Sequence, residues 1–117
     1  MGSGSGMAEL RIDTERTPDA RASAESDHPN KDAVTVRVAG EVDLDTAEQL
    51  AAGLEACHGT VVVDLAGVTF IDSSGLGTLI RARNRLTSEG GGLLVREPTE
   101  RVRQLFELTG LTELLAD

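Results

Sequence analysis

Two short segments of this 117-residue chain gather the side chains that could do chemistry. One segment is residues 40–47 (GEVDLDTA), which carries carboxylates, and the other is residues 70–77 (FIDSSGLG), which carries two serine hydroxyls beside a carboxylate. A serine in the first turn of a helix presents its hydroxyl next to unsatisfied backbone N–H groups, which favour an anion such as phosphate. The second segment therefore presents candidate functional hydroxyls at the start of a helix.

The spacing of these side chains does not support an enzymatic use. A hydrolase would flank its nucleophilic serine with glycines two residues away on each side, whereas Ser74 has Asp72 and Leu76 there, and no histidine follows a suitable strand. A P-loop would need Lys followed by Ser or Thr after the glycine-rich turn, and that pair is missing. Cys57 and His58 lack further ligands at metal-site spacing. We therefore expect no enzyme activity, no metal and no cofactor.

The first segment lies between a predicted strand and a predicted helix. Valines alternate with polar residues over 34–38, which is typical of a half-buried strand, and Gly40 is expected to end it. Asp45 is a suitable N-cap for the following helix, with Glu48 three residues later in the capping-box position. Apolar residues at helical spacing extend toward residues 58–59, where we expect this helix to end.

The second segment follows the β-branched run at 60–65, which is apolar on both faces, as in a central parallel strand. The helix predicted after Ser74 places Leu79 inward and directs Arg81 and Arg85 toward solvent. A further buried strand at residues 93–95, a helix from about residue 98 to 110, and a short helical turn at 111–115 complete the pattern.

This alternation predicts a single α/β domain with right-handed crossovers. The sheet is expected to be mixed but mostly parallel, with about four to five strands, an antiparallel N-terminal hairpin that begins at residues 9–15, and about four helices. Residues 1–6 (MGSGSG) are typical of an added linker, so the domain is expected to span residues 7–117. The polar, proline-containing stretch 16–32 predicts a long loop.

The charge and composition exclude several partners. With 20 acidic and 11 basic side chains the net charge is −9, and the chain has only two aromatic residues, both Phe. This balance argues against nucleic acid, which needs clustered basic groups and stacking platforms. No apolar run could span a membrane, no signal segment opens the chain, and a single Cys permits no internal disulfide. We expect a cytoplasmic protein without membrane or nucleic-acid partners.

The two segments, with the valine-rich run 61–65 between them, resemble the STAS domain of bacterial anti-sigma factor antagonists. The resemblance covers about residues 9–117, and its most specific part is the DSSGLG run at 72–77. It implies that Ser74 is phosphorylated by the anti-sigma factor itself, a serine kinase that the unphosphorylated protein binds so that the sigma factor is released. A PP2C-type phosphatase would reverse the modification. The polar loop 16–32 departs from the tighter hairpin of many relatives.

The resemblance also implies a partner-binding surface around Ser74, on which Gly75 and Gly77 would let a partner's backbone approach closely. Phosphate adds roughly −1.5 to −2 charge beside Asp72, on a face that is already acidic. All of the net charge lies in residues 1–80, which carry 14 acidic and 5 basic side chains. The expected partner-binding residues are Asp43, Asp45, Thr46, Asp72, Ser73, Ser74, Gly75, Leu76 and Gly77.

Simpler interpretations exist for the same residues. Asp72 or Ser73 is a suitable N-cap, Asp43 is equally suited to fixing its own turn, and Asp45 is better explained as a cap than as a contact. Arg81 and Arg85 are expected to form a solvated face. The alternative function is a sensory or scaffolding STAS module that binds a nucleotide or small ligand without a kinase switch.

Overall fold

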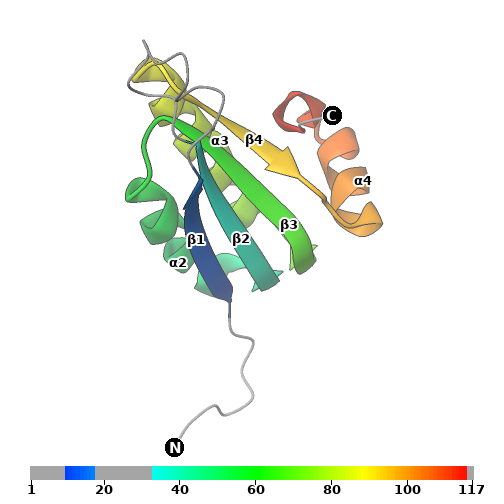
Figure 1. Cartoon of the computed structure of the whole chain (residues 1–117). Coiled ribbons are helices and arrows are strands. Elements are labelled where there is room, and N and C mark those ends of the chain that lie inside the picture. Colours follow the sequence, from blue (N-terminus) through cyan, green and yellow to red (C-terminus); the bar gives the residue numbers. More distant parts are fainter. Residues whose placement is uncertain (1–9, 18–32, 116–117) are drawn as a thin grey trace, which may run out of the picture.

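The computed structural model describes residues 10–17 and 33–115 (Figure 1). Within these residues four strands form one sheet in the order β1-β2-β3-β4. Strand β1 pairs antiparallel with β2, whereas β2, β3 and β4 are parallel to one another. The mixed sheet and its N-terminal hairpin confirm the predicted fold class. The strands are β1 (Arg11–Thr17), β2 (Ala33–Val42), β3 (Thr60–Ile71) and β4 (Gly92–Arg96).

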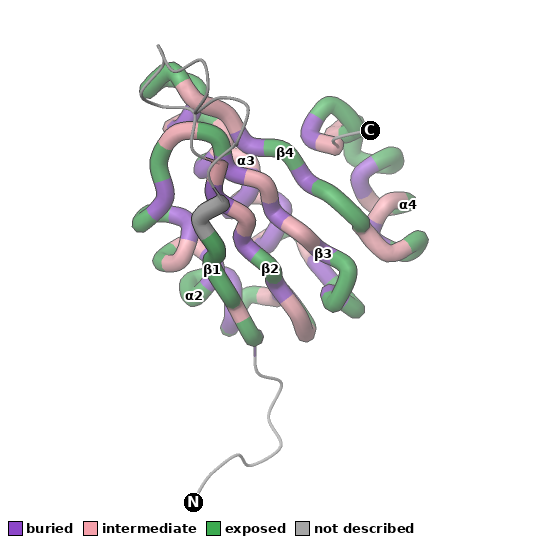
Figure 2. The backbone as a smooth tube through the Cα atoms, viewed as in Figure 1, coloured by how far each residue is buried: buried purple, intermediate pink, exposed green. Residues whose placement is uncertain are grey.

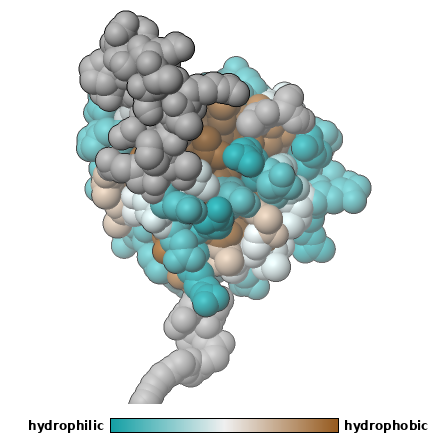
Figure 3. Space-filling model, viewed as in Figure 1, coloured by the Kyte–Doolittle hydropathy of each residue, from teal (hydrophilic) through white to brown (hydrophobic). Residues whose placement is uncertain are grey.

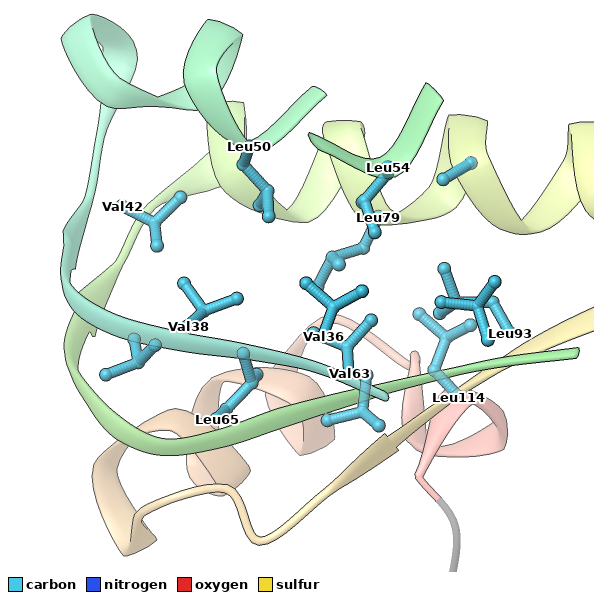
Figure 4. Packing of buried hydrophobic residues seen from close by; sticks show 14 of the residues in the cluster. Val36, Val38, Val42, Leu50, Leu54, Val63, Leu65, Leu79, Leu93 and Leu114 are labelled. Atoms are coloured by element: carbon cyan, nitrogen blue, oxygen red, sulfur yellow. The ribbon is translucent and has the colours of Figure 1, made fainter. Parts of the chain in front are cut away.

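Helices cover both faces of the sheet, as Figure 4 shows. Helices α2 (Leu44–Glu55) and α3 (Ser73–Ser88) pack against one face, and α4 (Glu100–Leu108) lies on the other with the 3₁₀ helix η1 (Thr112–Leu114). The short helix η1 falls where the final helical turn was predicted. No helix in the described parts of the chain is long and apolar enough to cross a membrane.

The main core lies between the sheet and the pair α2 and α3. Burial alternates along the strands, so that every second residue of the first part of β2 and β3 points into this layer (Figure 2). Each fully buried aliphatic side chain contributes about 1.5–3 kcal/mol relative to exposure. Residues of this layer are Val36, Val38, Val63, Leu65, Leu50, Leu54 and Leu79 (Figure 4).

The opposite face of the sheet is more polar near β1. Figure 3 shows hydrophilic side chains there beside a hydrophobic area. Arg37 of β2 forms an ion pair with Glu15 of β1 at 2.6 Å, with both side chains more than half exposed. An exposed pair of this kind contributes little to stability, because solvent screens the two charges.

Strand β2 does not stop at Gly40, as predicted, but continues to Val42. Gly40 has φ 112°, and the register against β3 shifts between Gly40 and Glu41. Because glycine tolerates this backbone conformation, it permits an irregularity within the strand instead of ending it. The first three residues of the segment 40–47 therefore belong to β2 and carry it to the edge of the sheet.

Strand β3 is also longer than predicted, since it runs six residues past Leu65 to Ile71. The Asp64 carboxylate accepts a hydrogen bond from the amide of Ala66 at 2.9 Å, within a register shift of β3 against β2. Two such shifts keep Val68 and Ile71 buried although the simple alternation is lost. Periodicity alone could not extend the prediction through these irregularities.

Two predicted boundaries also change. Helix α2 ends at Glu55, before the predicted end at residues 58–59. Strand β1 extends to Thr17, two residues into the predicted loop 16–32, and residues 18–32 of that loop lie outside the described residues.

Candidate functional site

The two chemically distinctive segments become neighbouring turns at the carboxyl edge of the sheet. Residues 42–46 run from the last residue of β2 into the first turn of α2. Residues 71–75 run in the same way from β3 into α3. The strands end side by side, with Val42 paired to Ile71. The amide of Asp72 donates a hydrogen bond to the carbonyl oxygen of Val42 at 3.0 Å, so that one backbone hydrogen bond joins the turns. We call residues 42–46 the first turn and residues 71–75 the second turn.

The first turn is closed by a reciprocal capping box. Asp43, and not the predicted Asp45, is the N-cap of α2, and its carboxylate accepts from the amides of Asp45 and Thr46 at 3.0 and 3.1 Å. The capping-box partner is Thr46 instead of Glu48. Its hydroxyl oxygen accepts from the amide of Asp43 at 2.9 Å and the hydroxyl donates to the carbonyl of Glu41 at 2.8 Å. The fold therefore uses the Thr46 hydroxyl completely.

The second turn has a one-sided cap. The Asp72 carboxylate accepts from the amides of Ser74 and Gly75 at 2.9 and 3.3 Å, so Asp72 is the N-cap of α3. The backbone carbonyl of Ser74 accepts from the Thr78 hydroxyl at 3.0 Å. Within the described residues, no hydrogen bond uses the side-chain hydroxyl of Ser74 or of Ser73. Capping thus explains Asp72 and leaves both serine hydroxyls available.

The predicted site residues differ in how much surface they present. Asp45 and Ser73 are exposed, whereas the side chains of Thr46 and Leu76 are buried in the protein, at 7% and 5% exposure. The half-buried residues, which reach the surface in part, are Asp43, Asp72, Ser74 and Gly77. The edge therefore brings all nine predicted residues together, but it exposes the side chains of only some of them.

Gly75 of the second turn and Gly77, two residues further along α3, have different roles. A Cβ atom on Gly75 would lie 2.6 Å from side-chain carbons of both Ile71 and Val42, so this glycine lets α3 begin directly against the strand ends. Gly75 therefore has a role in the protein's own packing. At Gly77 the nearest neighbour would be the flexible end of Arg81, at 3.4 Å, and the surface there is open to a partner.

Carboxylates dominate the first turn and its surroundings. Glu41, Asp45 and Glu48 are exposed, and Asp43 is half-buried beside them. None of the four ion pairs formed among residues 10–17 and 33–115 involves any of them. The acidic surface at this edge is therefore not neutralised from within the described part of the chain.

The two arginines predicted to face solvent on α3 do not behave alike. Arg81 is exposed, as expected. Arg85 is not a solvated residue, because its Nη2 donates to the backbone carbonyls of Leu54 and Cys57 at 2.9 and 3.0 Å. These carbonyls belong to the C-terminal end of α2, where a positive charge is favoured. Arg85 therefore ties α2 to α3.

Sequence reasoning missed two exposed apolar side chains at this edge. Leu44, the first residue of α2, is 74% exposed, and Phe70, just before the second turn, is 41% exposed. Phe70 lines a groove of about 210 Å³ beside α4. Leu44 directly follows the N-cap, before the first buried residues of α2. Its position between two aspartates was the sequence feature that could have indicated its exposure.

The geometry agrees with comparisons to known proteins. The chain belongs to the STAS-domain family, since the family described as "Mlab, STAS domain" matches residues 27–116. Among its relatives, the anti-sigma-B factor antagonist of Listeria monocytogenes is 33% identical over 97 residues, covering 80% of this chain and 85% of that protein.

Solved structures show the same relationship. The anti-sigma factor antagonist SpoIIAA in its unphosphorylated form matches with a TM-score of 0.65 and 27% identity, covering 73% of this chain and 78% of that chain. An anti-sigma factor antagonist from Mycobacterium paratuberculosis matches with a TM-score of 0.66 and 28% identity, covering 90% of this chain and 83% of that chain.

Proposed function

We propose that this chain is an anti-sigma factor antagonist that binds an anti-sigma factor serine kinase through the Ser74 turn and loses that partner when Ser74 is phosphorylated. The observation that carries the proposal is the unused Ser74 hydroxyl in the second residue of α3, at the edge where the acidic turns meet. Relatives named as anti-sigma factor antagonists support the function. In this role the chain is a cytoplasmic regulator and not an enzyme.

The modification is a phosphoryl transfer performed by the partner. The Ser74 Oγ attacks the γ-phosphorus of ATP, the bond from that phosphorus to the bridging oxygen of ADP breaks, and a base of the kinase takes the hydroxyl proton. A PP2C-type phosphatase would hydrolyse the resulting ester and restore the hydroxyl. Nothing in this cycle requires a catalytic group from the antagonist itself.

Phosphate on Ser74 is compatible with the fold. The phosphate would lie at the positive end of the helix dipole, while the amides of Ser74 and Gly75 stay bonded to the Asp72 carboxylate. Ser74 is half-buried and its hydroxyl has no partner in the described residues, so the modification breaks no hydrogen bond that the fold needs. We expect folding to be retained after phosphorylation.

Phosphorylation is expected to lower the affinity for the kinase and not the stability of the fold. A partner carboxylate about 4 Å from one added charge would be repelled by roughly 4 kcal/mol at an effective dielectric near 20. This corresponds to a loss of affinity on the order of a thousandfold, before screening by salt. Basic groups of the partner would lie opposite the first turn, whose carboxylates are not neutralised, and not opposite Ser74.

In the decisive experiment the purified chain and ATP are incubated together with one anti-sigma factor serine kinase at a time, for each such kinase encoded in the same genome. We expect one kinase to add a single phosphate, which mass spectrometry places on Ser74. Ser74→Ala should abolish the addition, whereas the matched variant Ser73→Ala should retain it. Addition at full stoichiometry to Ser74→Ala would overturn the assignment.

A binding titration separates the switch from the alternative of a ligand-sensing module. Ser74→Glu should weaken the kinase complex by about a hundredfold or more, with an almost unchanged thermal midpoint. Unchanged affinity would show that the second turn is not the contact. Saturable calorimetric binding of ATP or GTP to the isolated chain, without binding to any kinase, would favour the ligand-sensing module.

A further inference from the structure

Leu44 is unusual among the exposed apolar side chains because of its position. Single exposed leucines are ordinary on protein surfaces and need no explanation by themselves. Leu44, however, is 74% exposed in the first turn of α2, at the same sheet edge as Ser74. The other large apolar side chains exposed in the described residues are Phe70, Leu94 and Leu108.

The fold itself does not require a leucine at this position. The cap of α2 uses the Asp43 carboxylate, the backbone amides of Asp45 and Thr46, and the Thr46 hydroxyl. The buried residues of α2 begin at Thr46 and Ala47, so Leu44 is not part of the core. Its side chain is available to another molecule.

The surroundings of Leu44 define the chemistry of that molecule. Leu44 lies between Asp43 and Asp45 in the sequence, and exposed Glu41 and Glu48 lie within four residues along the chain. These carboxylates take part in no ion pair among residues 10–17 and 33–115. A complementary surface therefore has an apolar pocket with arginine or lysine at its rim.

The position of Leu44 connects it to the phosphorylation site. The hydrogen bond from the Asp72 amide to the Val42 carbonyl holds the first turn against the second. Leu44 lies two residues beyond Val42 in the first turn, and Ser74 lies two residues beyond Asp72 in the second. A protein that covers Ser74 closely enough to modify it therefore also reaches Leu44.

We propose that Leu44 is the apolar anchor of the antagonist, inserted into a pocket with a basic rim on the anti-sigma factor kinase. This inference rests on the proposed function and adds to it the contact that provides affinity. The carboxylates around Leu44 orient the complex, and the buried leucine slows its dissociation. Anchors of this kind, apolar at the centre and polar at the rim, dominate the energetics of many interfaces.

The test compares Leu44 with a matched leucine elsewhere. Leu108 of α4 is 83% exposed and lies in the groove beside Phe70, so Leu108→Ala removes the same atoms from a different surface. The affinity of each variant for the kinase that phosphorylates Ser74 is measured by calorimetry. We expect Leu44→Ala to raise Kd at least about tenfold, and Leu108→Ala to change it less than about twofold.

Two further variants separate chemistry from folding. Leu44→Met keeps an apolar anchor and should retain most of the affinity, whereas Leu44→Gln is similar in size but polar and should lose it. Circular dichroism and thermal midpoints should be the same for all variants, because the changed side chains are exposed.

The outcomes distinguish the anchor from the proposed function. If the wild-type chain is bound by no anti-sigma factor kinase and Ser74 is not modified, the proposed function fails. If the wild-type chain is bound and phosphorylated but Leu44→Ala binds equally well, the anchor fails and the function stands. If Leu108→Ala weakens binding as much as Leu44→Ala, or Leu44→Gln binds as tightly as Leu44→Met, the assignment to Leu44 is wrong.

Discussion

The two turns at the carboxyl edge begin in the same way and use their hydroxyls differently. In each, an aspartate with extended backbone caps the helix through two backbone amides. In the first turn the hydroxyl of Thr46 is buried and bonded to the backbone on both sides. In the second turn the hydroxyl of Ser74 is left out of the hydrogen bonds that the described residues make. A hydroxyl that is needed for the fold's own hydrogen bonds cannot be modified without loss of stability, whereas a hydroxyl without such bonds can.

The largest expected effect concerns two glycines close to Ser74. Gly75→Ala should lower the free energy of unfolding by about 2 kcal/mol or more, because the new methyl group would press against Ile71 and Val42. Gly77→Ala should be neutral or stabilising by up to about 1 kcal/mol, since alanine favours the helix and the site is open. Urea denaturation of both variants tests the pair. Equal destabilisation would contradict the distinction between a packing glycine and a surface glycine.

The hydroxyls themselves provide the next test. Thr46→Val should cost about 1–2 kcal/mol of unfolding free energy, because it leaves the Asp43 amide without its side-chain acceptor. Ser74→Ala should stay within about 0.5 kcal/mol of the wild type. Chemical denaturation measures both. If Ser74→Ala is as destabilising as Thr46→Val, the Ser74 hydroxyl is structural and the contrast between the turns disappears.

The opposite end of α2 offers a smaller effect. Arg85→Met should cost about 1 kcal/mol, because the C-terminal carbonyls of α2 lose a charged donor at a partly exposed position. Arg81→Met, on the same helix but without such contacts, serves as the control and should be neutral within about 0.5 kcal/mol. Thermal unfolding at neutral pH compares them, and a neutral Arg85→Met would remove the proposed tie between the helices.

The smallest expected effect concerns pH at this same end of the molecule. The hydrogen bond with His58, and then Arg85, lowers the pKa of Glu89 below its ordinary value of 4.5. A lowered pKa in the folded state means stability that is present above pH 4.5 and is lost as the pH falls through the folded value. Glu89→Gln should therefore have a slightly lower thermal midpoint near pH 6, and the difference should shrink as the pH is lowered below 4.5. A difference independent of pH would contradict the ion pair.

Much of the fold and part of the site could be predicted from local patterns. Alternation identified β1 and β2, and short apolar runs identified β3 and β4. Helical spacing identified α3, and the DSSG run identified the capped turn with a spare hydroxyl. The sequence predicts the N-cap of α2 at Asp45, however, because Glu48 stands three residues later in the capping-box position. The true cap at Asp43 depends on where the strand stops, and pairing of Val42 with Ile71, 29 positions away in sequence, decides that.

Two other features could not be predicted because they depend on how elements pack. Helical periodicity placed Arg85 on the outer face of α3, but the long side chain reaches α2, and only the packing of the two helices brings the Leu54 carbonyl within reach. Leucine is a residue type that is usually buried. Leu44 is exposed, however, because α2 begins at the edge of the sheet, where its first residue does not pack against the core. Both features arise from three-dimensional contacts between distant segments.

The route by which the chain enters the sheet has a practical consequence for biophysical measurements. Arg11 pairs with Ala39 near the carboxyl edge, and the Leu10 carbonyl accepts a hydrogen bond from Gln49 of α2 at 3.0 Å. A fluorophore attached at this end of β1 would therefore lie near the same edge as Leu44 and Ser74, and its emission should change when a partner binds there. Leu115, in contrast, bridges Val95, which pairs with Val63 in the first part of β3, away from the carboxyl edge. An immobilisation tag on that side would leave the surface around Leu44 and Ser74 free.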